Sequence, residues 1–314
     1  MTGGRNIFLL ITLTVLVAIG TAIQFFRSGR EESFVDPTLF KTEGLGKIDS
    51  VTLESKKGTI RLGYTQTGWK INGQYAADRQ LITVLFATLE QVVPKRPVAA
   101  VATDSVNAML DTAGVSVSLF ENRVLKKHFV AGGDAQHKQA WFRLERNTPA
   151  YVVTIPGYRV YVSQIFGLDV NGWRDKRIFD FNWRNFKSLS ASFTNDPSSD
   201  FKIEHNSRFF DIAGAPGDTS KVNSYLDELS LLRADQIISR GESTRYDSLA
   251  STRPVIKLEI ADIAGRKYEL VLFGSIPGDP FVLGMAHEDD LVLFSRDQLK
   301  SIFVRRQFFR LPPR

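Results

Sequence analysis

The sequence contains no cysteine, and it holds only four histidines and three methionines in 314 residues. A chain without cysteine cannot form disulfides, thiolate zinc sites or a cysteine nucleophile. The histidines, His128, His137, His205 and His287, show no metal-ligand spacing. Asp134 and His137 fall within one predicted turn, but two ligands do not make a metal site. We therefore expect neither a metal nor a cofactor.

Motifs that mark common catalytic and phosphate sites are missing as well. No Gly-x-Ser-x-Gly nucleophile elbow occurs. The glycine-rich runs 131–134 and 273–278 lack a Gly-Lys-Ser/Thr ending, and each joins two strand-like runs, which predicts hairpin turns. Neighbouring acids such as Asp289-Asp290 point apart in a strand, which favours solvated side chains. A glycosidase pair distant in sequence stays open, although nothing supports it. We expect a protein that is not an enzyme.

Charge and composition exclude further classes. The net charge is +6 with a pI of about 9.4, and charged residues make up 24% of the chain. Lys and Arg are mostly interspersed with Asp and Glu, whereas a nucleic-acid interface needs a basic stripe, so no nucleic-acid partner is expected. A hydrophobic content of 43% in this length suits about two domains with substantial cores.

One long hydrophobic run is present, between Asn6 and Phe26, and it carries no charge. These 21 residues would span roughly 31 Å as a helix, which matches a hydrocarbon core of about 30 Å. The run predicts a single transmembrane anchor, with a cleaved signal peptide ending near 20–22 as the alternative. An N-terminal anchor before a long folded chain usually acts as a signal anchor, so we expect the bulk of the chain to be extracytoplasmic. The polar residues 28–46 would form a tether.

The most informative pattern is a stretch that occurs twice. Gly68 to Val93 reads as a strand, a turn and a capped helix, and the run that begins at Arg208 repeats it. Counterparts 141 residues apart are Trp69 and Phe210, Ile71 and Ile212, and Gly73 and Gly214. Counterparts 140 residues apart are Asp78 and Asp218, Ile82 and Val222, Leu85 and Tyr225, Phe86 and Leu226, Leu89 and Leu229, and Val92 and Leu232. The pattern indicates tandem duplication of a unit of about 140 residues.

Local chemistry predicts the elements of each unit. Asp78 and Asp218 suit helix N-caps, and the apolar residues that follow keep to one side of a 3.6-residue helix. In the first unit we expect a hairpin over 48–64, a helix over 103–113, a final short helix over 158–168, and four strands over 115–120, 124–131, 140–144 and 151–155. The matching strands of the second unit are predicted from Val115 and Ile256 (offset 141), Val130 and Leu272 (offset 142), Trp141 and Phe281 (offset 140), and Tyr151 and Leu291 (offset 140). A weaker match pairs Ile165-Phe166 with Ile302-Phe303.

The predicted fold is α+β: an N-terminal transmembrane helix followed by two tandem repeats, each a mainly antiparallel sheet with a helix packed on one face. The predicted segments are an anchor over 1–27, a tether over 28–46, a first repeat over 47–172, a charged junction over 173–182 and a second repeat over 183–314. The junction runs from Trp173 to Phe179 and holds four consecutive charges between aromatic residues. We expect its rings to pack and its charges to face solvent or a partner.

Two further features have a functional and a structural interpretation. The basic end 296–314 suits either an anionic partner or the last helix of the second repeat, with Phe308-Phe309 beyond the repeat and free for contacts. Trp69 and Trp141 have hydrophobic counterparts and indicate packing, whereas exposed Trp173 and Trp183 would suit stacking on carbohydrate.

The chain resembles a bacterial family of membrane-anchored proteins of unknown function, often encoded beside a gliding-motility-type ABC transporter permease and its extracytoplasmic auxiliary subunit. The resemblance covers nearly all of residues 45–310. It rests on the opening strand 48–53, on Gly68-Trp69-Lys70-Ile71 leading to Ala77-Asp78 and a striped helix, and on the charged junction. Many members carry a proline before the Ala-Asp pair, where this chain has Tyr75-Ala76.

The resemblance implies an accessory role in an ABC-type membrane complex, with protein partners and no catalytic residues to carry over. The first functional hypothesis is thus a non-catalytic, membrane-anchored, extracytoplasmic interaction protein. The alternative is a module that binds cell-envelope glycan or peptide in a cleft between the repeats.

Overall fold

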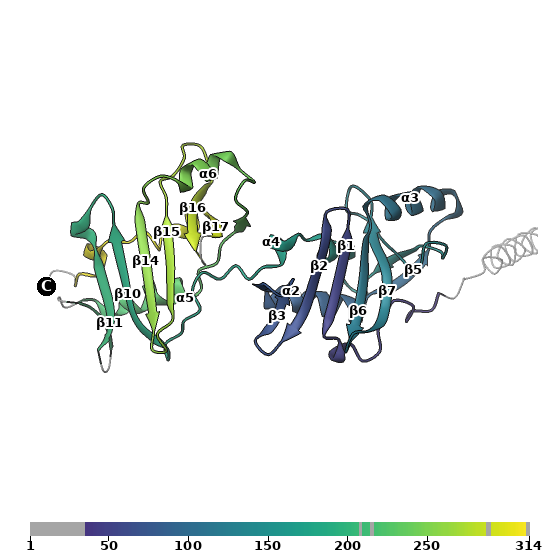
Figure 1. Ribbon diagram of the computed structural model, residues 1–314, viewed down its shortest axis with the longest axis horizontal. Helices are drawn as coiled ribbons and strands as arrows, with labels where there is room; N and C mark the ends of the chain where they lie inside the picture. Colours follow the sequence, from purple (N-terminus) through teal and green to yellow (C-terminus); the bar gives the residue numbers. More distant parts are fainter. Residues whose placement is uncertain (1–34, 207–208, 214–216, 287–289, 312–314) are drawn as a thin grey trace, which may run out of the picture.

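The structure is a computed structural model that describes residues 35–206, 209–213, 217–286 and 290–311 (Figure 1). The predicted anchor over 1–27 and the tether up to residue 34 lie outside the described residues. Within the described ranges, no helix is both long enough and apolar enough to cross a bilayer.

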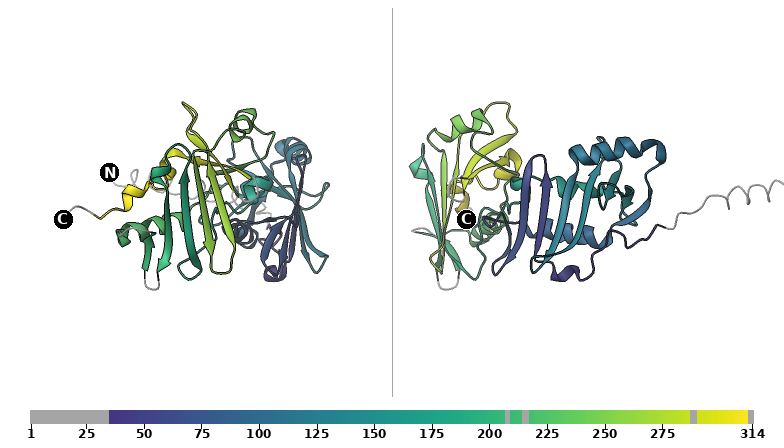
Figure 2. Two further views of the ribbon diagram at one scale, coloured as in Figure 1. Left: turned by 60° about the vertical axis from the view of Figure 1, so that its left-hand side comes forward. Right: turned by 45° about the vertical axis from the view of Figure 1, so that its right-hand side comes forward.

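The fold class is α+β, as predicted, with two antiparallel sheets that each carry helices. Figures 1 and 2 show the sheets in two halves that stand side by side and are joined by one segment. The elements of the first half are η1 (Leu45–Lys47), β1 (Ser50–Ser55), β2 (Gly58–Thr65), β3 (Gly68–Ile71), β4 (Tyr75–Ala76), α2 (Arg79–Gln91), β5 (Val93–Pro97), η2 (Ala100–Ala102), α3 (Thr103–Ala113), β6 (Val115–Glu121), β7 (Val124–Gly133), β8 (Ala140–Arg143), β9 (Tyr151–Thr154), η3 (Val162–Gly167) and α4 (Val170–Trp173).

The second half repeats this series after the junction. Its elements are β10 (Phe186–Phe193), η4 (Pro197–Ser199), β11 (Phe201–Asn206), β12 (Phe209–Ile212), α5 (Thr219–Ser230), β13 (Gln236–Ile238), α6 (Thr244–Ala250), β14 (Ile256–Asp262), β15 (Lys267–Leu272), β16 (Phe281–Ala286), β17 (Asp290–Ser295), α7 (Arg296–Leu299) and η5 (Arg306–Phe309).

The two sheets share one strand order. Among the described residues, the first runs β4-β3-β2-β1-β6-β7-β8-β9-β5 and the second runs β12-β11-β10-β14-β15-β16-β17-β13. The orders correspond strand by strand, apart from β4, which extends the first sheet beyond β3. The long helices α2 and α5 follow β4 and β12, and each precedes the strand at the far edge of its sheet, β5 or β13.

Strand register tests the predicted counterparts residue by residue. Leu62 pairs with Ile71 and Ile203 pairs with Ile212, so the offset of 141 is confirmed at the third strand. Val115 and Ile256 also match, since their partners are Ala131 and Leu272. The counterpart of Leu272 is therefore Ala131, and the predicted match with Val130 is wrong by one residue. A shift of one residue moves every side chain of a strand to the opposite face.

The last two strands of each half need the same kind of correction. Trp141 pairs with Val152, and Leu283 pairs with Leu293. Trp141 therefore corresponds to Leu283 instead of Phe281, and Tyr151 corresponds to Val292 instead of Leu291. The hairpin loops differ in length between the halves, and alternating apolar residues match almost equally well at neighbouring offsets.

The helix caps and stripes are as predicted. The carboxylate of Asp78 accepts from the amides of Gln80 and Leu81 at 2.7 and 3.3 Å, and that of Asp218 accepts from Ser220 and Lys221 at 3.0 and 3.3 Å. Each satisfies amides that have no partner within the first helical turn. The buried apolar stripes of the two helices are Ile82, Leu85 and Leu89 in α2, and Val222, Tyr225, Leu226 and Leu229 in α5.

Helices cover both faces of each sheet, whereas one covered face was predicted. The larger core of the first half lies on the α2 side, and a second cluster joins Val106 and Leu110 of α3 to Trp141 and Val152. In the second half, residues of α6 pack in the same way on Val271, Phe273 and Leu283. All four residues of β8 are buried, because side chains from both faces of this strand meet a helix layer or the core.

One edge strand was not predicted, and one prediction fails after β9. The helix α2 ends at Gln91, and residues 93–97 form the edge strand β5, where an unpaired proline nitrogen costs no ladder hydrogen bond. The helix expected over 158–168 is the shorter 3₁₀ helix η3. The helix over 103–113 is confirmed as α3.

Candidate binding cleft at the junction of the halves

The segment that follows α4 is bound to the first half by its backbone. The amide of Asp78, the N-cap of α2, donates to the carbonyl of Trp173 at 2.9 Å. The amide of Asp175 donates to the carbonyl of Ala76 at 2.9 Å, and Ala77 and Arg174 form an antiparallel bridge. The start of the junction thus acts as a short strand beside the N-terminus of α2.

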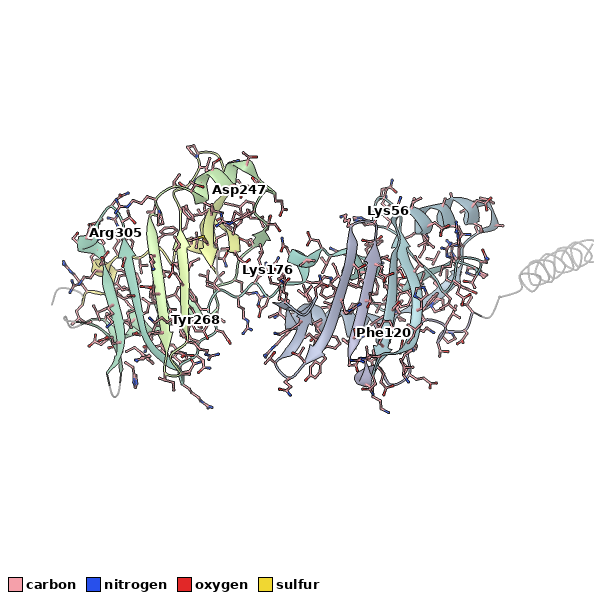
Figure 3. The ribbon with its side chains drawn as sticks, viewed as in Figure 1. Lys56, Phe120, Lys176, Asp247, Tyr268 and Arg305 are labelled. Atoms are coloured by element: carbon pink, nitrogen blue, oxygen red, sulfur yellow. The ribbon has the colours of Figure 1, made fainter. Side chains whose placement is uncertain are left out.

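The same segment then binds the second half. The amide of Ile178 donates to the carbonyl of Leu232 at 3.0 Å, and the amide of Ala234 donates to the carbonyl of Lys176 at 2.8 Å. These contacts lie just after the end of α5. Figure 3 shows Lys176 between the two halves. We call residues 174–178 the junction strand, and its backbone bonds to both halves fix their relative position.

An ion pair crosses between the halves next to the junction strand. The guanidinium of Arg174 donates to both carboxylate oxygens of Asp290 at the start of β17. The Arg174 guanidinium carbon also lies 3.8 Å from the ring centroid of Tyr75, in β4. The side chains of Arg174 and Asp290 are only 11% and 22% exposed, so this pair is shielded from solvent screening. It holds the second sheet against the end of the first.

A second set of charges centres on Arg233. Its guanidinium donates to Asp78 of the first half and lies 3.9 Å from Asp175. Burial raises the pKa of Asp175, but the hydrogen bonds from Arg177 and the nearby guanidinium of Arg233 outweigh it and hold the pKa below its usual value. The hydrogen bonds that Arg177 donates to Asp175 likewise raise the pKa of Arg177. Asp175 and Arg177 therefore stay charged and paired near neutral pH.

The junction charges thus differ from the prediction that they face solvent or a partner. They mostly pair with each other and across the halves, because the fold brings acids and bases from distant sequence positions together at the junction. Trp173, expected to be exposed, is fully buried in the core of the first half. It cannot stack on a carbohydrate. Phe179 is buried in the second core, so the prediction that the bracketing rings pack is confirmed.

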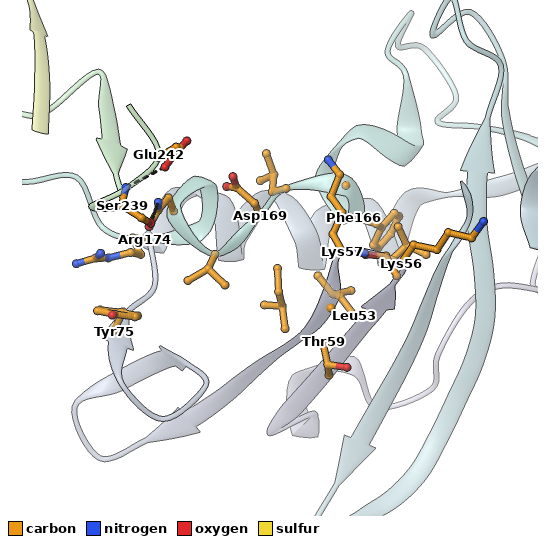
Figure 4. Close-up of a pocket in the computed structure, with 18 of the residues that line it drawn as sticks. Leu53, Lys56, Lys57, Thr59, Tyr75, Phe166, Asp169, Arg174, Ser239 and Glu242 are labelled. Carbon is orange, nitrogen blue, oxygen red and sulfur yellow. Dashed lines mark hydrogen bonds between the residues drawn. The ribbon is translucent and has the colours of Figure 1, made fainter. Parts of the chain in front are cut away.

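A cleft of about 980 Å³ opens on one side of the Arg174 pair, between the two halves (Figure 4). Lys56 and Lys57, in the β1–β2 turn, lie along one wall, and Ser239 and Glu242 come from the opposite wall. Asp169, the N-cap of α4, projects between them. The apolar part of the lining comprises Leu53, Ile60, Phe166, Leu168, Val170, Ile238 and Leu291.

A second cleft of about 1030 Å³ lies against the same ion pair. Tyr75, Arg174 and Asp290 line both clefts, so these three side chains form the wall between them. The second cleft is lined further by the junction residues Asp175 and Arg177 and by strands β15 and β16. The junction therefore presents a concave surface on two sides.

The chemistry of the first cleft suits binding. Its lining combines cationic Lys56, Lys57 and Arg240 with anionic Asp169 and Glu242 around an apolar floor. Such a mixture can hold the charged ends and apolar side chains of an extended peptide. Asp169 is occupied in part, because it accepts from the amide of Gly172 at 2.6 Å.

The histidines do not converge. His128 Nδ1 lies 3.1 Å from the hydroxyl of Ser118 in the neighbouring strand, His137 stacks on Tyr161, and His205 contacts Phe210. His287 lies outside the described residues. Within the described ranges, no group of three or more His, Asp or Glu residues is placed to hold a metal ion. The glycine-rich run 273–278 lies between β15 and β16, as predicted for a hairpin connection, whereas residues 131–133 of the other run form the end of β7 and only Asp134 falls in the turn before β8.

Sequence reasoning missed the residues that define the clefts. Tyr75, Arg233 and Asp290 lie 99 or more positions from the partners Arg174 and Asp78 and follow no motif, so no local pattern marks them. One signal was available: Arg233 stands where the first repeat has Val93, a charge in place of an apolar residue at an otherwise matched position.

Two expectations about aromatic residues can be checked away from the clefts. Trp183 is 45% exposed and contacts Phe210 of β12, and it does not line either cleft. Phe309, which was placed beyond the repeat, is buried in the second core against Phe201 and Tyr225. Phe308 beside it is 43% exposed.

Comparison with known families gives one match, to a domain of unknown function, DUF4340, over residues 69–250. The match begins at Trp69, covers the junction and part of the lining of each cleft, and includes more than half of the chain. Comparisons with curated proteins and with solved structures gave no match.

Proposed function

The chain belongs to the DUF4340 family of unknown function, and we propose that it is a non-catalytic interaction protein of the cell envelope. In this proposal it is an accessory component of a gliding-motility-type ABC transporter complex. The observation that carries the proposal is the junction strand, which is bonded to both halves and flanked by two clefts. Two rigidly joined modules with concave surfaces suit the binding of another protein.

The location is part of the proposal. The uncharged run 6–26 would anchor the chain in the inner membrane once, with the two halves on the periplasmic side. Residues 28–46 would tether the first half to the membrane. Protease treatment of intact cells and of spheroplasts tests this: a C-terminal tag should be cleaved only in spheroplasts. Protection of the tag in both preparations would contradict the orientation.

The origin of the two halves belongs to the same proposal. We infer that they descend from one ancestral unit, which the shared strand order and the paired N-caps Asp78 and Asp218 support. A duplicated unit has two similar surfaces, and the contact between the halves shows one way in which such a unit binds another.

Purification of the full chain from mild detergent tests the transporter association. Permease subunits should co-purify with a tagged chain, and in vivo cross-linking should join the two proteins. The matched control is a chain with Ile263→Asp on an exposed turn, which should retain the association. A monomer that yields no cross-linked permease would overturn this assignment.

The alternative function is the binding of envelope peptide or glycan in the first cleft. The specific observation in its favour is the mixed lining of Lys57, Asp169 and Glu242 over an apolar floor. A peptide fits better than a glycan, because the aromatic lining residues of this cleft are Tyr75 and Phe166 and neither Trp173 nor Trp183 lines it. The full chain should pellet with isolated cell-wall sacculi, and the charge reversals Lys57→Glu and Asp169→Lys should weaken this binding. Unchanged pelleting of both variants would contradict the binding of envelope peptide or glycan in this cleft.

A further inference from the structure

The two halves end in the same way. The helical turns α4 and η5 each contain four residues and end at a buried aromatic, Trp173 or Phe309. The carbonyl of Trp173 accepts from the amide of the N-cap Asp78, and the carbonyl of Phe309 accepts from the amide of the N-cap Asp218 at 2.8 Å. Phe309 is therefore the counterpart of Trp173, 136 positions later.

The backbone leaves both turns in the same conformation. Arg174 has φ −66° and ψ 146°, and Arg310 has φ −65° and ψ 142°. In the first half, this exit leads into the junction strand and so onto the second half. Arg310 therefore occupies in the second half the position that Arg174 occupies in the first half, where the chain leaves the first half and contacts the second.

Among the described residues, the surface around Arg310 and Asp218 has no equivalent of Asp290 and Arg233, which pair with Arg174 and Asp78 in the first half. Asp78 is only 8% exposed and receives Arg233 from the second half, whereas the side chain of Asp218 is 24% exposed and its nearest cation is Lys221 at 4.0 Å. Arg174 is paired with Asp290, whereas Arg310 is exposed and forms no ion pair with any described residue. Phe308 and Leu311 are 43% and 56% exposed there.

We propose that Asp218, Phe308, Arg310 and Leu311, the terminal surface, form a docking site for a separate protein that supplies an arginine and a carboxylate. The arginine would meet Asp218 as Arg233 meets Asp78, and the carboxylate would meet Arg310 as Asp290 meets Arg174. The apolar side chains of Phe308 and Leu311 would be covered at the same time. This inference rests on the proposed interaction role and assigns it to a surface.

A second copy of this chain does not fit as the occupant. The receiving surface on its second half, at Leu232, Arg233 and Ala234, is already bonded to its own junction strand. The equivalent positions of its first half are Val92, Val93 and Pro94, which offer no guanidinium and no amide at the third position. The occupant is thus a different chain.

The terminal surface also lies where a separate protein can reach it. Figure 3 shows Arg305 on the side of the second half that faces away from Lys176 and the first half. A partner bound here would therefore lie on the side of the second half that faces away from the first half.

Site-specific photo-cross-linking of the full chain in cells tests the proposal. A photoreactive amino acid placed at Phe308 or at Leu311 should give an adduct with another protein. The same residue at Val101 or Ile263, which are 97% and 69% exposed elsewhere, should not. Arg310→Glu should reduce the adduct about tenfold, because a lost charge pair becomes a repulsion. Reversal of an acid in the cross-linked peptide of the partner should restore it.

Three results would overturn the proposal: no adduct from 308 or 311, an adduct only with another copy of the chain, or a yield that Arg310→Glu leaves unchanged. Circular dichroism and the melting temperature of R310E should match the parent chain, since Arg310 is exposed. The test of the terminal surface can fail or succeed independently of the transporter proposal. Permease co-purification without adducts at 308 and 311 would reject only the terminal surface, and adducts with a protein other than a transporter subunit would reject only the transporter.

Discussion

The two halves of the chain share their strand order, but they hold the helices α3 and α6 on their sheets with opposite arrangements of charge. In the first half, the sheet supplies the cation: Arg143 of β8 is 2% exposed and donates to Asp111 and Asn107 of α3. In the second half, the acid is buried: Asp279, before β16, accepts from Arg245 and Tyr246 of α6. The two halves share strand order and helix position, while the side chains that hold the layers together differ.

The comparison predicts that substitutions at equivalent positions of the two halves reduce the free energy of unfolding by similar amounts. Trp173→Ala and Phe309→Ala should each reduce the free energy of unfolding by about 3–5 kcal/mol, since each removes a fully buried aromatic from one core. Urea unfolding with a probe in each half would show which half is affected. A variant that lowers the stability of neither half would break the equivalence of the two turns.

The next prediction concerns the first half, where the buried member of the ion pair between the sheet and α3 is the cation Arg143. Asp111→Ala should destabilise the first half strongly, because the buried Arg143 loses its carboxylate partner and its Nε already lacks a hydrogen bond. The double variant Asp111→Leu/Arg143→Met should recover most of the loss by removing the buried charge. Thermal melts of both variants measure this, and a double variant no more stable than the single one would refute the account.

The N-caps give a smaller and unequal pair of effects. Asp218→Ala should cost about 1 kcal/mol, as expected for a helix cap alone. Asp78→Ala should cost about 2 kcal/mol, because Arg233 loses its partner as well as α2 its cap. Denaturant unfolding of each variant gives the two values. Equal costs would show that the ion pair between the halves adds nothing to stability.

The smallest expected effect is the change in stability at acidic pH. Burial raises the pKa of Asp175, but the hydrogen bonds from Arg177 prevail and lower it overall. An aspartate with a lowered folded pKa contributes stability above its unfolded pKa of about 3.9 and loses it as the pH falls through the folded pKa. The stability difference between the parent chain and Asp175→Asn should hold at pH 5–7, at about 1 kcal/mol, and shrink below about pH 4. A difference that does not change with pH would exclude a titrating carboxylate.

Much of the fold could be predicted because local chemistry determines it. Asp78 and Asp218 signal helix starts, and the spacing of Ile82, Leu85 and Leu89 determines the buried face of α2. The α3 helix over 103–113 ends before Gly114, as its sequence indicates. These features need only neighbours within a few positions.

Features that depend on distant contacts could not be predicted in this way. The offset at Val130 was wrong by one residue because both faces of β7 are apolar, which removes the alternation that identifies a register. Trp173 was expected to be exposed because its sequence neighbours are charged, yet its burial depends on α2. Phe309 was placed outside the repeat, and the hydrogen bond that its carbonyl accepts from the amide of Asp218 reveals its equivalence to Trp173.

The edge strand β5 has a consequence for behaviour at high concentration. Pro94 and Pro97 offer no amide to an incoming strand, and the pairing of β5 with β9 shifts register between Pro94 and Arg96. Lys95 and Arg96 add like charges that two such edges would bring together. Growth of the first sheet into an intermolecular stack is therefore opposed at its outermost strand. Crowded copies of the chain can therefore lie edge to edge at β5 without fusing their sheets.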